Sequence, residues 1–214
     1  EFSIDLEGGL IKGKGSLKIK KLPLNTANIF LNEPKDFQGG LDMNLFYDLD
    51  SKSFSSEISS SNAAIKNNQI IFDKGQIKYN DSIFDIDFSL RLDDSKIPIK
   101  IEGLIPVNKK DKLDLRLTGN DKFIELIDIL TDEYFTFKKG DVHLRMIIKG
   151  SFGKPIVNGF LVIKDSEIDI YENLIKNLDS IILFDFDHVQ IKNLEASDEG
   201  SGNIVINGSL PFYN

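Results

Sequence analysis

The strict alternation of apolar and polar residues from Phe84 to Asp93 constrains the fold of this chain more than any other feature. Five apolar residues alternate with five polar ones over this stretch. A repeat of two is that of a β-strand with one dry face and one wet face. The same alternation recurs in Phe2–Leu6, Leu41–Leu49, Leu113–Leu117 and Val142–Ile148. The chain is therefore predicted to be mainly β.

Short polar segments rich in Gly, Asn, Asp and Lys separate the alternating runs. They lie at residues 7–9, 67–68, 73–75, 80–81, 93–94 and 138–141. Their composition and spacing are typical of antiparallel hairpins and meanders. We expect a dozen or more short strands in an antiparallel-rich sheet.

Two stretches break the alternation and predict one or two short helices. Residues Asn120–Asp132 begin with a capping residue and predict a helix of about three turns. Residues Tyr171–Asp179 predict a helix of two turns. The Ser-rich segment Ser51–Ser61 fits either a flexible loop or a weak edge strand. The apolar stripes of the two helices are Phe123, Ile124, Ile127 and Leu130, and Leu174, Ile175 and Leu178.

A degenerate internal repeat indicates how the sheet is extended. Residues Ile99–Val107 are echoed by Ile204–Phe212, with four identical positions and the same apolar pattern. The repeats are unevenly spaced, which favours a sheet extended strand by strand over a regular solenoid. We predict one continuous β-rich domain over residues 1–214, and we expect it to be a fragment of a larger protein.

The composition excludes several classes of function. The 214 residues carry a formal net charge of -8, which is the wrong sign for a protein that binds the phosphate backbone of nucleic acid. No stretch approaches the roughly 20 consecutive apolar residues of a membrane-spanning helix. The absence of Cys excludes thiol catalysis and disulfides but leaves the cellular compartment open.

An apolar face that runs along a dozen strands must be covered, since exposure costs roughly 25 cal/mol per Å². A second sheet, closure into a barrel, docked helices or a bound apolar ligand could cover it. With 16 Phe and no Trp, the dry surface suits a core or an acyl-chain groove equally. The residues predicted to line it are Phe84, Ile86, Phe88, Leu90, Leu92, Leu113, Leu115, Leu117, Val142, Leu144, Met146, Ile148, Ile204, Ile206 and Leu210.

The chain offers few candidates for chemistry. The sequence holds no nucleophile elbow, phosphate loop, dinucleotide fingerprint or zinc spacing. We interpret both histidines, His143 and His188, as surface residues. The pairs Asp85/Asp87 and Asp185/Asp187 could hold a cation, but Asp-x-Asp is also the pattern of a wet strand face in an acidic chain. We therefore predict a protein that is not an enzyme and has no metal or cofactor. Arg91, Arg116 and Arg145 are predicted to lie mid-strand on the wet face.

The order of elements in the C-terminal half resembles a known family. A strand ending in Gly150-Ser151 is followed by Lys154-Pro155, by Gly159–Ile168, by Ile182–Asp187 and by Gly200–Leu210. This succession resembles the C-terminal domain of the TamB family (translocation and assembly module), in the AsmA-like superfamily of bridge-like lipid transfer proteins. The resemblance is strongest over residues 99–214, and the strand pattern of residues 1–98 is compatible with it.

The resemblance implies both a fold and a function. The fold would be an elongated, curved sheet, a β-taco with an apolar concave groove. The function would be transport of glycerophospholipids between the inner and outer membranes, in the periplasm or intermembrane space of a diderm bacterium. The full-length protein would be anchored in the inner membrane, and similar proteins occur in cyanobacteria and the chloroplast envelope. Its partners would be phospholipid acyl chains and an outer-membrane protein of the BamA superfamily.

Two other functions stay open at this stage. An exposed strand edge could assist assembly of outer-membrane β-barrel proteins by strand augmentation. A sandwich-fold carbohydrate-active enzyme would depend on Asp185 or Asp187.

Overall fold

A computed structural model describes residues 3–8, 13–30, 36–65, 68–92, 95–124, 126, 136–170, 173–198 and 202–212. Strands make up 81% of the described residues, which confirms the prediction of a mainly β, antiparallel chain. The chain divides into two compact units, unit 1 over residues 1–111 and unit 2 over residues 112–214. The single continuous domain stays a prediction.

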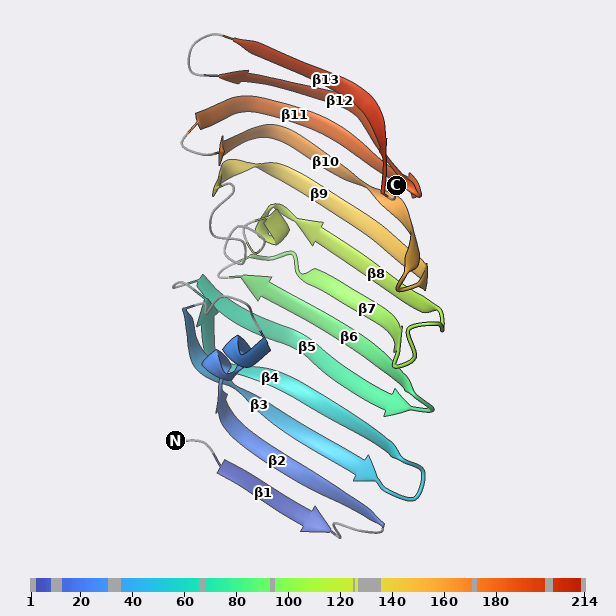
Figure 1. Cartoon of the computed structure of the whole chain (residues 1–214). Coiled ribbons are helices and arrows are strands. Elements are labelled where there is room, and N and C mark those ends of the chain that lie inside the picture. The colour runs from blue at the N-terminus through green and yellow to red at the C-terminus, as the bar shows by residue number, and fades with distance from the viewer. Residues whose placement is uncertain are drawn as a thin grey trace. The chain divides into compact units, whose positions relative to one another are not determined.

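Unit 1 is a meander in which each strand pairs antiparallel with the next along the chain (Figure 1). A short 3-10 helix, η1 (Leu24–Phe30), follows the second strand. The strands are β1 (Ser3–Gly8), β2 (Lys14–Pro23), β3 (Phe37–Asp48), β4 (Ser53–Ile65), β5 (Asn68–Asn80), β6 (Ile83–Leu92) and β7 (Ile99–Pro106).

Unit 2 repeats this arrangement with longer strands. The strands are β8 (Leu113–Asn120), β9 (Thr136–Ser151), β10 (Lys154–Ile170), β11 (Asn173–Phe186), β12 (His188–Asp198) and β13 (Asn203–Pro211). The two segments that echo one another in sequence are the last strand of each unit, β7 and β13. No helix in the described part of the chain is long and apolar enough to cross a membrane.

The strand register separates two faces in each unit. In unit 1, Ile86 lies opposite Ile77 of β5 and Gly103 of β7, and the polar Asp87 lies opposite Gln76 and Glu102. In unit 2, Ile182 lies opposite Leu161 and Ile191. We call the side that carries Ile86 in unit 1 and Ile182 in unit 2 the apolar face, and the opposite side the outer face.

Two predicted turns are wrong, because both lie inside long strands. Residues 73–75 belong to β5, where the register with β6 shifts between Phe72 and Lys74. Residues 138–141 belong to β9, where the register with β10 shifts between Lys164 and Glu167. The extra residue of a β-bulge bends a strand without ending it. The polar and Gly residues that signal a hairpin turn also suit a bulge.

The predicted helix at Tyr171–Asp179 is also wrong, because the described residues from Asn173 onward belong to β11. Register shifts between β10 and β11 interrupt the alternation there, so a bulged strand shows an apparent helical spacing. The Ser-rich segment is a strand, β4, with partners on both sides and is therefore not an edge strand.

Of the helix predicted at Asn120–Asp132, Asn120 ends β8 and residues 121–124 and 126 are helical. The remainder lies outside the described residues, as does the predicted turn at 93–94. The 3-10 helix η1 was not predicted from the sequence.

Cross-strand ion pairs stabilise the outer face. Arg91 donates two hydrogen bonds to Asp73, at 2.6 and 2.7 Å, and Lys74 pairs with Asp87. In unit 2 the ammonium of Lys149 lies 3.0 Å from a carboxylate oxygen of Asp114. Arg116 and Arg145 are exposed on the outer face, as predicted for all three arginines.

Replacing Asp73 by Asn should remove an acid-sensitive part of the stability. Hydrogen bonds from Arg91 hold the pKa of Asp73 below its usual 3.8. A carboxylate with a lowered pKa stabilises the folded state above the unfolded-state pKa, and this contribution is lost as the pH falls through the folded value. Because the pair is partly exposed, the melting temperature should fall by only about 1–2 °C at pH 7. Melting curves of wild type and variant should converge below pH 3.8; a constant gap down to pH 2 would contradict this.

Candidate functional site: the apolar face

In unit 1 the apolar face is formed by every strand whose side chains are described. Phe84, Ile86, Phe88, Leu90 and Leu92 of β6 all lie on this face, as the alternation predicts. The residues of the other strands that share this face were not identified as site residues from the sequence. These residues are Leu17, Ile19, Leu41, Met43, Leu45, Tyr47, Phe54, Ile58, Ile70, Phe72, Ile77, Tyr79, Ile99, Ile101 and Ile105.

In unit 2 the predicted residues of three strands again share one face. Leu115 lies opposite Ile148, and Leu117 lies opposite Met146, so β8 and β9 contribute as predicted. On β13, Ile204, Ile206 and Leu210 lie on the same face. Between them the structure adds three strands that carry no predicted site residue, β10, β11 and β12. The added residues are Val157, Leu161, Ile163, Leu178, Ile182, Phe184, Val189, Ile191 and Leu194.

The two central strands of unit 2, β10 and β11, show a continuous apolar run in the sequence in place of the alternation seen in the other strands. Gly159–Ile163 in β10 and Ile181–Phe184 in β11 are continuous apolar runs without alternation. Continuous runs of this length are typical of strands that are apolar on both sides. The outer face accordingly carries Phe160, Val162, Ile181 and Leu183 at neighbouring positions.

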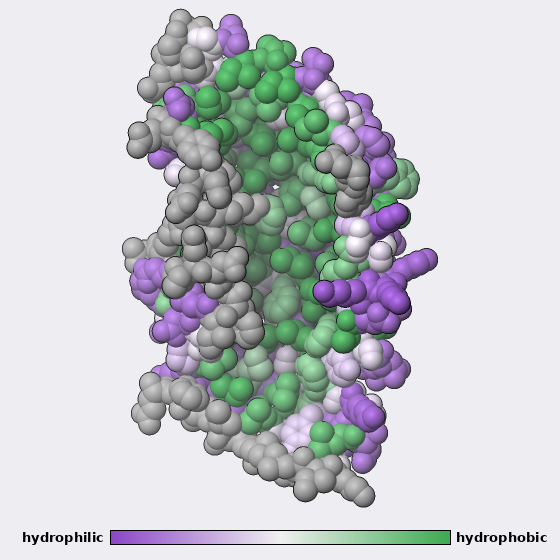
Figure 2. Space-filling view, viewed as in Figure 1, coloured by the Kyte–Doolittle hydropathy of each residue, from purple (hydrophilic) through white to green (hydrophobic). Residues whose placement is uncertain are grey.

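Burial of the apolar face is uneven along the strands. Val142, Leu92 and Ile99 are fully buried, and Ile70, Leu144 and Leu178 near them are also buried. Towards the middle, Met146, Leu161, Ile182 and their neighbours remain partly exposed, although apolar side chains surround them. Among the described residues no second layer of strands or helices covers these central positions. Figure 2 shows the result, with apolar side chains gathered over the strands and hydrophilic ones around them.

Aromatic rings are concentrated at one end of the strands. In unit 1, Phe54 stacks on Tyr79 with ring centroids 5.4 Å apart, and Phe84 contacts both rings. In unit 2, Phe184 stacks on Phe212 at 6.3 Å. The fully buried aliphatic residues lie near the opposite strand ends. In unit 1 the apolar face therefore grades from a packed aliphatic end to a partly exposed aromatic end. In unit 2, Leu113 and Val157 are buried near the aromatic end as well.

The candidate polar sites do not assemble. His143 is exposed on the outer face, and its Nε2 lies 3.4 Å from a carboxylate oxygen of Asp141. Asp187 lies in the turn between β11 and β12 and pairs with His188, so it does not share a strand face with Asp185. This hydrogen bond lowers the pKa of Asp187. Over the described ranges, no three His, Asp or Glu side chains converge as a metal site would require.

Comparison with protein-family models, curated proteins and solved structures finds no match to this chain. The function is therefore argued from the geometry of the apolar face.

Proposed function

We propose that the apolar face binds the acyl chains of glycerophospholipids and carries them between the inner and outer membranes. In this proposal the chain is a TamB-like segment in the periplasm or intermembrane space, and it catalyses no reaction. The observation that carries the proposal is the partial exposure of apolar side chains at the centre of a face that no second layer of described residues covers. Bare apolar area is unfavourable in water, so a lipid would supply the missing layer.

The dimensions of the face suit acyl chains. From Val142 to Ile148 the apolar positions of β9 extend over about 20 Å, at roughly 3.4 Å per residue. The hydrocarbon core of a bilayer is about 30 Å thick for two leaflets, so the tails of one lipid occupy about 15 Å. The tails of one lipid therefore fit along the length of the strands.

The outer face gives further support. Its charged residues are paired in several places, as Arg91 is with Asp73 and Lys139 with Glu167, which suits a surface in contact with water. The centre of the apolar face in unit 2 instead carries uncharged apolar residues at adjacent cross-strand positions. These residues are Met146, Leu161, Ile182 and Ile191. The contrast between the two faces separates an aqueous side from a side that can hold lipid tails.

Native mass spectrometry of gently purified protein tests this function. We expect bound species with the masses of phospholipids, released by an excess of detergent. Repeated preparations without any bound lipid, together with a face that binds no added phospholipid, would contradict the proposal.

A second function is supported by strand β13. This strand carries no charged residue, and Val205 and Leu210 are exposed. Among the described strands, β13 pairs with β12 alone and is an edge of the sheet. An uncharged strand edge can accept another strand by backbone hydrogen bonding, so β13 could receive a segment of an outer-membrane β-barrel protein during assembly with a BamA-type partner. Photo-crosslinks from β13 to an unfolded barrel protein, without bound lipid, would favour this function over lipid transport.

A further inference from the structure

Two hairpin turns at one end of unit 2 each carry an exposed Phe. Phe152 and Gly153 form the turn between Ser151 and Lys154, which pair with each other, and Phe186 and Asp187 form the next turn but one. Both turns lie at the same end of the sheet, since Val157 near the start of β10 pairs with Phe186. Phe152 is 46% exposed and Phe186 is 59% exposed.

Neither the turn geometry nor packing accounts for Phe186. Its φ angle of +59° lies in the left-handed region, which Gly and Asn adopt readily and a bulky side chain does not. Asn or Gly would suit this turn better. The ring is mostly exposed, so it gains little from burial within the chain. A Phe at this position is therefore explained by something that the ring contacts outside the described residues.

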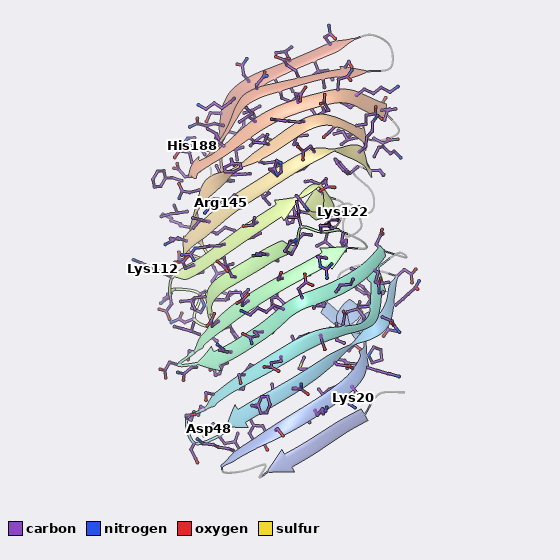
Figure 3. All side chains as sticks on the ribbon, turned by 180° about the vertical axis from the view of Figure 1, so that it is seen from behind. Lys20, Asp48, Lys112, Lys122, Arg145 and His188 are labelled. Carbon is purple, nitrogen blue, oxygen red and sulfur yellow. The ribbon has the colours of Figure 1, made fainter. Side chains whose placement is uncertain are left out.

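The surroundings of the two turns are those of an interfacial anchor. The apolar face reaches this end of the sheet through the Phe184–Phe212 stack and the exposed Leu210. Lys154, which follows the first turn, is exposed, and Lys112 lies at the same end (Figure 3). His188 also lies there and pairs with Asp187 of the second turn. Long basic side chains beside exposed aromatic rings can extend to the headgroups while the rings enter the acyl region.

We propose that Phe152 and Phe186 insert into the headgroup–acyl boundary of a phospholipid bilayer and dock this end of unit 2 on the membrane. Docking would bring the apolar face next to the lipids that it is proposed to carry, so the inference extends the proposed function. The observations favour a bilayer over a protein pocket because the two rings protrude separately from turns at one end of unit 2, where Lys112 and Lys154 are exposed. The net charge of -8 favours a zwitterionic surface over an anionic one.

Co-sedimentation of the whole chain with sucrose-loaded phosphatidylcholine vesicles tests the docking. We expect wild type to sediment with the vesicles, and Phe152→Ser with Phe186→Asn to weaken partitioning at least about tenfold, since two exposed rings are lost. Phe186→Asn alone should raise the melting temperature by about 2 °C, because Asn tolerates the left-handed conformation. Val205→Ser is the matched control, since Val205 is 66% exposed near the opposite end of unit 2 and should not affect binding.

A dye at the turn measures insertion directly. The chain has no Cys, so Gly153→Cys gives a single labelling site, and a Cβ at Gly153 meets no atom within 4 Å. An environment-sensitive dye at position 153 should shift its emission to the blue when phosphatidylcholine vesicles are added. The same dye on Val205→Cys should not respond.

The test separates docking from lipid carriage. The Phe152→Ser/Phe186→Asn variant should still bind phospholipid delivered from detergent, and Ile182→Asp should dock on vesicles without carrying lipid. The docking proposal is overturned if wild type and the double variant sediment equally, or if the dye at position 153 does not respond. A loss of self-association instead of vesicle binding in the double variant would also overturn it, because the turns would then be protein contacts.

Discussion

Replacing Ile182 by Asp should abolish phospholipid binding by unit 2, whereas the same replacement at the adjacent Ile181 should leave binding intact. The two residues are neighbours in β11 with side chains on opposite faces: Ile182 lies between Leu161 and Ile191 on the apolar face, and Ile181 is 44% exposed on the outer face. An ionised carboxylate against acyl chains costs several kcal/mol in desolvation. Binding of a fluorescent phospholipid to the two purified variants measures the difference.

The effect of Ile182→Asp on folding should be modest, because the partly exposed position lets the carboxylate reach water when lipid is absent. Val142 provides the contrast. Its side chain is fully buried on the same face, so Val142→Asp should leave an unpaired buried charge and unfold unit 2, at a cost of more than about 3 kcal/mol. If Ile182→Asp unfolds the protein as completely as Val142→Asp, the centre of the apolar face is a closed core and not a lipid surface.

Replacing Gly140 by Ala should destabilise unit 2 by roughly 2–4 kcal/mol. Gly140 lies in β9 with a φ of +138°, a conformation that disfavours any side chain. A Cβ there would lie 1.9 Å from the Ser166 hydroxyl and 2.5 Å from the Ser166 Cα. Ser166 is fully buried and donates a hydrogen bond to the Lys164 carbonyl, so it cannot move aside without loss.

Chemical denaturation of Gly140→Ala and Gly153→Ala checks this expectation. Gly153 is the matched control, because a Cβ there meets no atom within 4 Å and its φ is not positive. The control should unfold within about 0.5 kcal/mol of wild type. Equal stabilities of the two variants would show that β9 and β10 can separate at the bulge without penalty.

The apolar face could be predicted from the sequence wherever a strand has one dry side. The runs Phe84–Leu92 and Leu113–Leu117 alternate without interruption, and Val142–Ile148 alternates except at Ile147. The structure places the predicted apolar residues of each run on a single face of its unit. In β10 and β11 both sides are apolar, so period 2 disappears from the sequence. The contribution of β10 and β11 to the centre of the face in unit 2 was therefore missed.

The turns and helices were harder to predict for a related reason. A β-bulge uses the same residue types as a hairpin turn. The sequence therefore does not distinguish a bulge from a turn at Asp73–Gly75 or at Lys138–Asp141. The strand continues through each bulge because β5 pairs with β6, and β9 with β10, on both sides of the register shift. Similarly, the phase shift of a bulged strand gave Leu174, Ile175 and Leu178 an apparent helical spacing.

The most direct test of the apolar face is photo-crosslinking in living cells that produce the protein. Benzoylphenylalanine is placed at position 182 on the apolar face or at position 181 on the outer face, and the adducts are identified by mass spectrometry. We expect phospholipid adducts from position 182 and none from position 181. Phospholipid adducts in equal amounts from both positions, or protein adducts alone from position 182, would contradict it.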